Sequence, residues 1–172
     1  VAAQQPVSGE RSLDGDGVPS LPRVDVVHQT PLPGLNVPAE QYPGNVQVSD
    51  EAELERSGAT NLPDFLNRRM PNVSIAEVQG SPYQIDLSYR GHRLSPLLGS
   101  PQGLSVYIDG VRVNQPLGDV MDWDLVPEMA LADMALIPGS NPLYGLNTLG
   151  GALVLGTKSG LTHPGTELDL TL

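Results

Sequence analysis

The stretch that decides the fold lies in the last third of the chain and consists of three separate pieces. They read Ile108-Asp109-Gly110, Pro138-Gly139-Ser140-Asn141-Pro142-Leu143-Tyr144-Gly145 and Gly150-Gly151-Ala152-Leu153-Val154-Leu155-Gly156-Thr157-Lys158. Asp109-Gly110 joins two β-rich runs and favours a primed hairpin turn, because both residues tolerate a positive φ angle. The apolar runs 134–137 and 152–155 have Gly or Pro beside them, which is typical of buried strands. These pieces predict short β elements joined by glycine-rich turns.

The composition of the chain excludes several classes of protein. Its 172 residues suit one domain with a sizeable core, but 19 glycines and 17 prolines argue against long helices or strands. With 20 Asp and Glu against nine Lys and Arg, the chain lacks the basic surface that nucleic-acid phosphates require. The absence of cysteine excludes a disulfide, a thiolate nucleophile and a thiolate metal site. No apolar run approaches the roughly twenty residues that a membrane-spanning helix needs.

Two short helices are predicted after a strand at 46–48. Asp50 can cap the first helix, and Glu53 completes the reciprocal arrangement of a capping box. Gly58 is expected to end this helix, because glycine readily adopts the left-handed conformation found there.

The second helix begins at Thr60-Asn61, carries Pro63 in its first turn and stops before Pro71. Its apolar face consists of Leu62, Phe65, Leu66 and Met70. Alternating apolar residues then predict strands around 73–75, 85–89, 104–108 and 111–113. A short turn or helix between Asp122 and Pro127 would hold Trp123 as the one large anchor. The predicted body is therefore α+β, with a small mixed sheet, short helices and long loops.

Residues 1–43 read as a flexible, partly extended arm, because prolines recur too often for a helix or a central strand. One β-rich island interrupts it at 24–30, which reads Val24-Asp25-Val26-Val27-His28-Gln29-Thr30. Its β-branched residues would favour an extended conformation if a strand edge were offered for pairing. The residues alone leave two partners open, an edge of this chain's own sheet or an edge of another protein.

The patterns for catalysis and metal binding are not met. His28, His92 and His163 are far apart in the sequence and have no partner at ligand spacing, so no metal site is predicted. The glycines from 145 to 151 lack the Gly-Lys-Ser/Thr ending of a phosphate-binding loop, so no cofactor is predicted. Asp122 and Asp124 are expected to be exposed acids, and a hydrolase built on them is the weakest of three hypotheses.

Six segments, in this order, resemble the plug domain of TonB-dependent outer-membrane receptors. They are Leu62-Pro63-Asp64-Phe65-Leu66 through Met70-Pro71-Asn72-Val73, Tyr89-Arg90-Gly91, Tyr107-Ile108-Asp109-Gly110, Ile137-Pro138-Gly139-Ser140, Leu143-Tyr144-Gly145 and 150–158. The match runs from about Val46 to Lys158. The resemblance implies structural roles for the signature residues Arg90, Gly91, Ile108, Asp109, Gly110, Gly139, Tyr144, Gly145, Gly150 and Gly151.

The resemblance also implies a domain organisation and a location. Residues 1–43 would be a periplasmic arm, 44–160 the plug, and 161–172 a linker with the start of the first barrel strand. The alternation of apolar and polar residues from 166 to 172 suits such a strand. The plug would sit inside a β-barrel in the bacterial outer membrane, with its N-terminus in the periplasm.

The implied function is that of a gating module in energised uptake of a siderophore or another nutrient. Val24, Asp25, Val26, Val27 and His28 would form the TonB box, which pairs as a strand with the periplasmic protein TonB. The other partners would be the chain's own barrel and a small-molecule or metal-complex ligand.

The resemblance to receptor plugs also indicates two further groups of site residues, and one alternative function stays open beside it. His92, Arg93 and Gln102 fall in the region of a possible apical ligand loop. Arg90 and Asp133 are the charged residues left to contact a barrel wall, because the strand before Gly139 is otherwise uncharged. The alternative is a free-standing soluble periplasmic binding or interaction domain with a plug-like fold.

Overall fold

The computed structural model describes residues 44–161 and 163–166. The predicted TonB box at 24–28 and most of the predicted barrel strand at 166–172 lie outside the described residues. No helix in the described part of the chain is long and apolar enough to cross a membrane.

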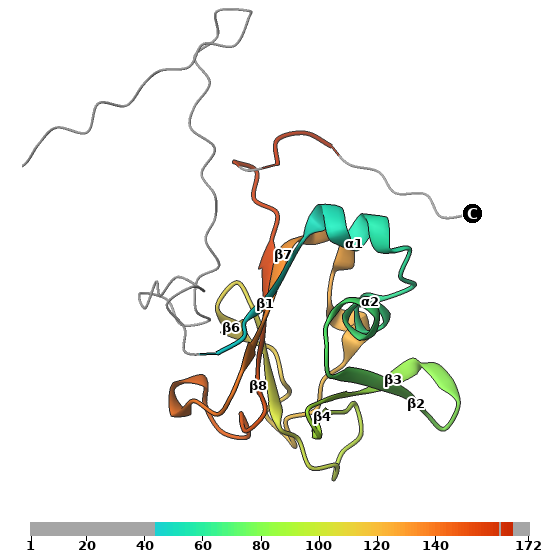
Figure 1. Ribbon diagram of the computed structural model, residues 1–172, viewed down its shortest axis with the longest axis vertical. Helices are drawn as coiled ribbons and strands as arrows, with labels where there is room; N and C mark the ends of the chain where they lie inside the picture. The colour runs from blue at the N-terminus through green and yellow to red at the C-terminus, as the bar shows by residue number, and fades with distance from the viewer. Residues whose placement is uncertain (1–43, 162, 167–172) are drawn as a thin grey trace, which may run out of the picture.

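The described residues form two β-sheets with two α-helices, so the predicted α+β fold is confirmed (Figure 1). The strands are β1 (Gln47–Asp50), β2 (Val73–Val78), β3 (Ser81–Tyr89), β4 (His92–Leu94), β5 (Leu104–Ile108), β6 (Val111–Arg112), β7 (Leu131–Pro138) and β8 (Gly151–Thr157). The helices are α1 (Glu51–Ser57) and α2 (Leu62–Arg69), with 3-10 turns η2 (Trp123–Leu125), η3 (Glu128–Ala130) and η4 (Pro142–Tyr144).

The larger sheet has the strand order β1-β7-β8-β5-β6, and the smaller one has the order β2-β3-β4. β5 pairs with β8 in parallel, whereas the other strand pairs among the described residues are antiparallel. The larger sheet is therefore mixed, as the sequence predicts. β1 forms one of its edges and directly precedes α1.

Both helix starts follow the predicted capping chemistry. The Asp50 side chain accepts a hydrogen bond from the Glu53 N–H at 2.8 Å, and the Asn61 side chain accepts one from the Asp64 N–H at 2.9 Å. The reciprocal half of the capping box was wrong, because the Glu53 carboxylate instead binds Arg69 at 2.9 Å. This ion pair joins α1 to the end of α2.

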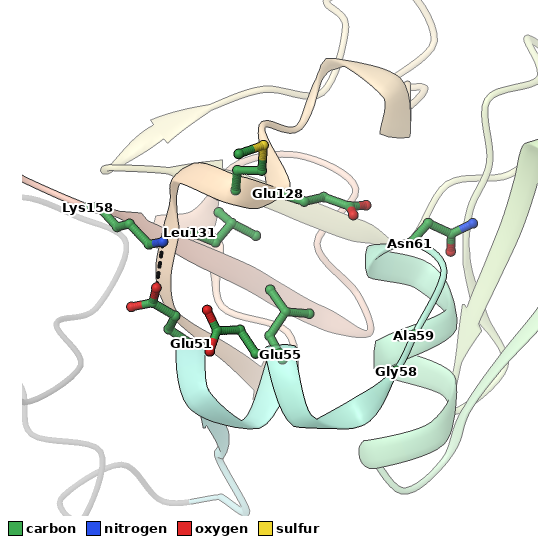
Figure 2. Close-up of a pocket in the computed structure, with 10 residues that line it drawn as sticks. Glu51, Glu55, Gly58, Ala59, Asn61, Glu128, Leu131 and Lys158 are labelled. Atoms are coloured by element: carbon green, nitrogen blue, oxygen red, sulfur yellow. Dashed lines mark ion pairs between the residues drawn. The ribbon is translucent and has the colours of Figure 1, made fainter. Parts of the chain in front are cut away.

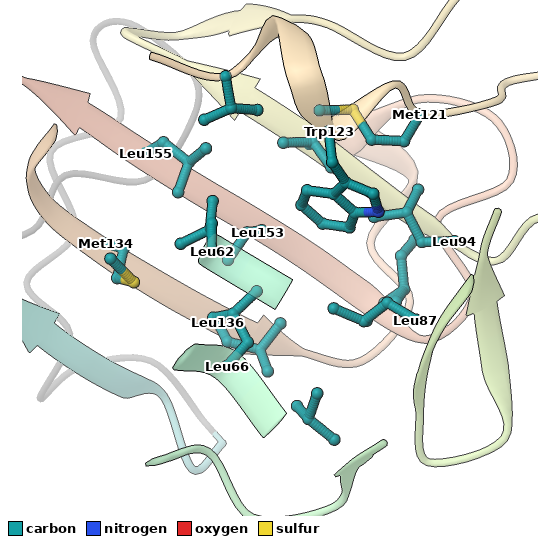
Figure 3. Close-up of a cluster of buried hydrophobic side chains, with 14 of the residues drawn as sticks. Leu62, Leu66, Leu87, Leu94, Met121, Trp123, Met134, Leu136, Leu153 and Leu155 are labelled. Carbon is teal, nitrogen blue, oxygen red and sulfur yellow. The ribbon is translucent and has the colours of Figure 1, made fainter. Parts of the chain in front are cut away.

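The core fills the space between the two sheets, with α2 between them (Figures 1 and 3). Leu62, Phe65 and Leu66 on the predicted apolar face of α2 are almost fully buried. Trp123 is the predicted anchor, and its indole N–H donates a hydrogen bond to the Ile85 carbonyl at 3.1 Å. Because this indole is satisfied inside the core, η2 is fixed against β3.

The predicted primed turn is confirmed between β5 and β6. Asp109 and Gly110 have φ angles of 49° and 81°, so both lie in the left-handed region. Arg90 and Gly91, which join β3 to β4, have φ angles of 51° and 83°. The Arg-Gly and Asp-Gly pairs of the signature therefore serve as two hairpin turns.

Candidate functional site

The Asp-Gly turn is tied to the end of β8. One carboxylate oxygen of Asp109 accepts the Thr157 N–H at 2.9 Å, and the other accepts the Thr157 hydroxyl at 2.6 Å. The Asp109 N–H donates to the Leu155 carbonyl at 3.0 Å. Because β5 and β8 are parallel neighbours, these bonds close the same end of both strands. Asp109 therefore has two structural roles. Its backbone forms the turn, and its carboxylate binds the turn to β8.

Signature glycines are packed tightly at the opposite end of β8. A Cβ atom on Gly151 would lie 2.2 Å from the Ile137 carbonyl oxygen, and Gly151 has a φ angle of 144°. A Cβ atom on Gly150 would lie 2.5 Å from the His92 Cβ. The Gly139 N–H donates to the Gly150 carbonyl at 3.1 Å. At Gly150 and Gly151 the backbone approaches its neighbours closely and leaves no room for a side chain, whereas nothing lies within 4 Å of a Cβ position on Gly139, whose φ angle is 97°.

Buried hydrogen bonds connect the loop between β7 and β8 to β5. The Tyr107 hydroxyl donates to the Tyr144 carbonyl at 2.5 Å, and the two rings pack edge to face with centroids 6.5 Å apart. The hydroxyls of Ser105 and Thr148 are bonded to each other at 2.5 Å. Burial raises the pKa of Tyr107, while the nearby Arg112 opposes this shift. Tyr144 therefore anchors the loop in the core.

A second polar network joins the same loop to the residues after β6. Arg112 donates to an Asp119 carboxylate oxygen at 3.0 Å and to the Leu146 carbonyl at 2.9 Å. The Asn147 amide binds the other Asp119 oxygen. Asn114 is buried and accepts the Val106 N–H at 2.7 Å. Two long loops are thereby held side by side.

The three residues predicted for an apical ligand loop have structural surroundings of their own. His92 and Arg93 belong to β4 and not to a loop, and Arg93 pairs with Asp86 at 3.5 Å. Gln102 is buried, and its amide exchanges two hydrogen bonds with the Ser95 backbone at 2.8 and 3.2 Å. None of the three lines the pocket beside α1 or the pocket at the start of β3. Their part in ligand binding stays a prediction.

One pocket of about 360 Å³ lies where the start of β3 meets the two loops that follow β4 and β6. It is lined by Ser81, Tyr83, Gln84, Pro96, Leu98, Gln115, Val120, Met121, Asp122 and Asp124. Tyr83 and Leu98 are 75% and 65% exposed. We call this the Tyr83 pocket. Pro96 and Leu98 come from the predicted ligand loop, but no sequence signal indicated Tyr83, because its neighbours come from distant parts of the chain.

A second pocket, of about 510 Å³, lies beside α1 (Figure 2). It is lined by Glu51, Leu54, Glu55, Gly58, Ala59, Asn61, Glu128, Met129, Leu131 and Lys158. Glu128 accepts the Leu62 N–H at 2.6 Å, and Lys158 binds Glu51 at 2.5 Å. Carboxylates therefore dominate its rim, and some of them hold the local structure together.

The charged residues predicted to meet a barrel wall lie on different elements. Arg90 is exposed, and its guanidinium lies 5.2 Å from the centroid of the Tyr89 ring. Asp133 lies on β7, where a Cβ atom on Gly156 would come within 2.3 Å of its carboxylate. No group of three or more potential metal ligands is found among the described residues. Contacts of Arg90 and Asp133 with a barrel stay a prediction.

Solved structures of several receptors share this fold. The ferric yersiniabactin uptake receptor FyuA from Yersinia pestis aligns with 70% of this chain and 18% of its own, at 21% identity and a TM-score of 0.53. The siderophore receptor PirA from Acinetobacter baumannii aligns with 70% and 18%, at 23% identity and a TM-score of 0.51. The hemophore receptor HasR of Serratia marcescens, solved with its hemophore HasA and heme, aligns with 69% and 17%, at 19% identity and a TM-score of 0.50.

The chain thus spans less than a fifth of the length of these receptors. The family model of the TonB-dependent receptor plug domain matches residues 38–152, which include both sheets up to the start of β8. The match covers the helices, the two hairpin turns and the glycines described above. The chain therefore belongs to the TonB-dependent receptor plug domain family.

Proposed function

We propose that this plug domain is the gating module of a TonB-dependent transporter in the bacterial outer membrane. It would occlude the receptor's barrel, contribute to the ligand site and couple to TonB. The observation that carries the proposal is the family match over residues 38–152 on a fold whose signature residues have structural roles. A free-standing soluble domain is not favoured, because the family and the structural relatives are receptors.

The work of this module is non-enzymatic in our proposal. A hydrolase would depend on the acid pair Asp122 and Asp124. The Asp122 carboxylate accepts the Asp124 N–H at 3.3 Å, so it serves as the cap of η2. Asp124 is exposed to solvent, so the pair lacks the enclosed site that catalysis by two carboxyl groups needs.

Coupling to TonB would depend on residues 24–28. They form a β-branched island in a proline-rich arm, which is the composition that strand addition needs. The arm leads into β1, an edge strand of the larger sheet. A pull on the arm would therefore reach the sheet first at β1.

A deletion of residues 24–28 tests this coupling in cells that depend on the transporter. We expect ligand uptake to be lost while ligand binding to cells is retained. Deletion of the equally long segment 11–15 in the same arm is the control and should leave uptake intact. Normal uptake after deletion of 24–28 would refute the assignment of the TonB box.

We infer that the Tyr83 pocket is the plug's contribution to the ligand site. Its lining combines two carboxylates, two carboxamides and hydroxyl groups with exposed apolar surface, and no Lys, Arg or His is among its lining residues. Such a lining favours a neutral or cationic ligand with an apolar part, because an anion would meet Asp122 and Asp124.

Substitution within the pocket tests this ligand class. Tyr83→Ala should weaken binding of the transported ligand about tenfold or more, because aromatic anchors commonly dominate such contacts. Asp124→Asn should weaken cationic ligands only. Leu125→Ala is the control, because Leu125 is 72% exposed but does not line the pocket. Equal affinities for Tyr83→Ala and Leu125→Ala would place the ligand site elsewhere.

A further inference from the structure

Three parts of the chain meet at the carboxylate of Glu51. The Lys158 ammonium lies 2.5 Å from one oxygen of Glu51, and the His163 Nε2 lies 3.2 Å from the other. Lys158 also donates its backbone N–H to the Ala130 carbonyl at 2.7 Å. We call Glu51, Lys158 and His163 the Glu51 junction.

The topology explains why these residues meet. β1 and β8 lie on either side of β7, and both run antiparallel to it. Their last residues therefore emerge at the same end of the sheet, beside the start of β7. Glu51 directly follows β1, and Lys158 directly follows β8. Figure 2 shows Lys158 reaching Glu51 at the edge of the pocket beside α1.

The surroundings of the junction make it stronger than an exposed surface pair. The side chains of Lys158 and Glu51 are only 13% and 25% exposed, so water screens their attraction less than it screens a surface ion pair. Loss of Glu51 would leave the ammonium of Lys158 in a largely buried position without this carboxylate. The residues that follow β8 therefore depend on a residue that follows β1.

From this arrangement we infer that Glu51 couples the edge strand β1 to the residues that leave β8. While β1 is paired with β7, Glu51 is in place and holds Lys158 and His163. When β1 separates from β7, Glu51 moves with α1 and releases both. The inference rests on the proposed function only in naming a pull on the arm as the event that moves β1.

Hydrogen–deuterium exchange of the full-length protein, read by mass spectrometry in the absence of TonB and ligand, tests this coupling. Glu51→Gln should speed exchange about three- to tenfold in peptides that contain Lys158 and His163. Because coupling between two sites is reciprocal, exchange of β1 should also rise. Glu55→Gln is the matched control, since Glu55 is an exposed glutamate on the same helix and the same charge is removed.

A second variant disrupts the other end of the coupling. Val48→Pro interrupts β1 at a residue that is 46% exposed, so little of the core is disturbed. It should speed exchange at Lys158 and His163 as much as Glu51→Gln does, and the double variant should add little. Exchange of β5 serves as the internal reference for global unfolding.

The inference is overturned if Glu51→Gln leaves β1 and the Lys158 and His163 peptides as protected as Glu55→Gln does. It is also overturned if Val48→Pro exposes β1 alone, or if the effects of the two variants simply add. None of these outcomes depends on transport, so the proposed function and this inference can fail separately.

Discussion

The carboxylate of Asp109 accepts both hydrogen bonds that Thr157 offers, one from its N–H at 2.9 Å and one from its hydroxyl at 2.6 Å. The two residues are 48 positions apart in the chain. Asp109 must also hold a φ angle of 49° in the turn between β5 and β6. Glycine and asparagine would satisfy the φ angle, but neither carries two acceptor oxygens.

Asp109→Gly keeps a residue that tolerates the positive φ angle but removes the carboxylate. We expect it to lower the free energy of unfolding by about 2 kcal/mol, because two hydrogen bonds to a charged acceptor are lost. Thr157→Val removes the hydroxyl bond alone and should cost about 1 kcal/mol. Urea denaturation followed by circular dichroism gives both values.

Gln79→Gly is the control for Asp109→Gly. Gln79 is exposed and has a φ angle of 54° in the turn between β2 and β3, so glycine relieves strain there without loss of a carboxylate bond. We expect little change or a small gain in stability. Equal effects of the two substitutions would mean that the Asp109 carboxylate contributes nothing.

Gly151→Ala should be among the most damaging single-methyl additions in the chain. The new Cβ would lie 2.2 Å from a backbone carbonyl oxygen of Ile137, and no side-chain rotation relieves a clash with backbone. We expect the free energy of unfolding, obtained from urea denaturation, to fall by about 3 kcal/mol or more. Gly160→Ala is the control, because nothing lies within 4 Å of its Cβ position. A stable Gly151→Ala variant would contradict the close strand approach.

The sequence predicted the parts of the fold that depend on near neighbours. Asp50 and Asn61 cap their helices through bonds that reach three residues along the chain, and Asp109-Gly110 forms its turn from its own φ preferences. Trp123 was identified as an anchor because it is the one Trp and no other side chain is as large. The caps and the turn are visible in the sequence because their partners stand beside them, whereas the hydrogen-bond partner of Trp123, the Ile85 carbonyl, is 38 positions away.

Partners that are distant in the chain could not be predicted. Glu128 accepts the N–H of Leu62 across 66 positions, and the Ser105 hydroxyl is bonded to that of Thr148 across 43. These side chains are polar, and polarity alone predicts exposure. The Tyr83 pocket was also missed, because residues from the start of β3 and from two later loops, distant in the chain, line it together.

Asp86→Asn should stabilise the protein at neutral pH. Burial raises the pKa of Asp86, with Arg93 opposing this shift, and one buried oxygen of Asp86 has no hydrogen-bond partner among the described residues. Because the folded state then binds the proton more tightly than the unfolded state, ionisation costs stability above the folded pKa. The gain from Asn should vanish as pH falls below the ordinary value of 3.8.

Asp64→Asn is the control of opposite sign. The hydrogen bond from Arg68 lowers the pKa of Asp64, and a hydrogen bond from the Thr60 backbone adds to this effect. This carboxylate therefore stabilises the fold above its unfolded pKa, and the contribution is lost as pH falls through the folded pKa. Thermal unfolding between pH 3 and pH 7 compares the two variants. A Tm difference of the same sign for both would contradict the assignment for Asp86.

Asn114→Ala should destabilise the junction between β5 and the loop after β6. Asn114 is 7% exposed, accepts the Val106 N–H at 2.7 Å, and donates to the carbonyls of Leu104 and Asp119 at 3.3 and 3.1 Å. Truncation leaves these backbone groups without their side-chain partner in a buried site. We therefore expect a loss of about 2–3 kcal/mol in the free energy of unfolding.

Gln115→Ala is the matched control for Asn114→Ala, because Gln115 is exposed and stands next in the chain. Its backbone N–H still donates to the Val120 carbonyl at 2.9 Å after the side chain is truncated. The urea concentration at the midpoint of unfolding should therefore be nearly the same for the control and the wild type, and clearly lower for Asn114→Ala. Arg112 and Asp119 are joined by a separate ion pair at 3.0 Å. If the two variants unfold at the same urea concentration, this ion pair holds the loop and Asn114 does not.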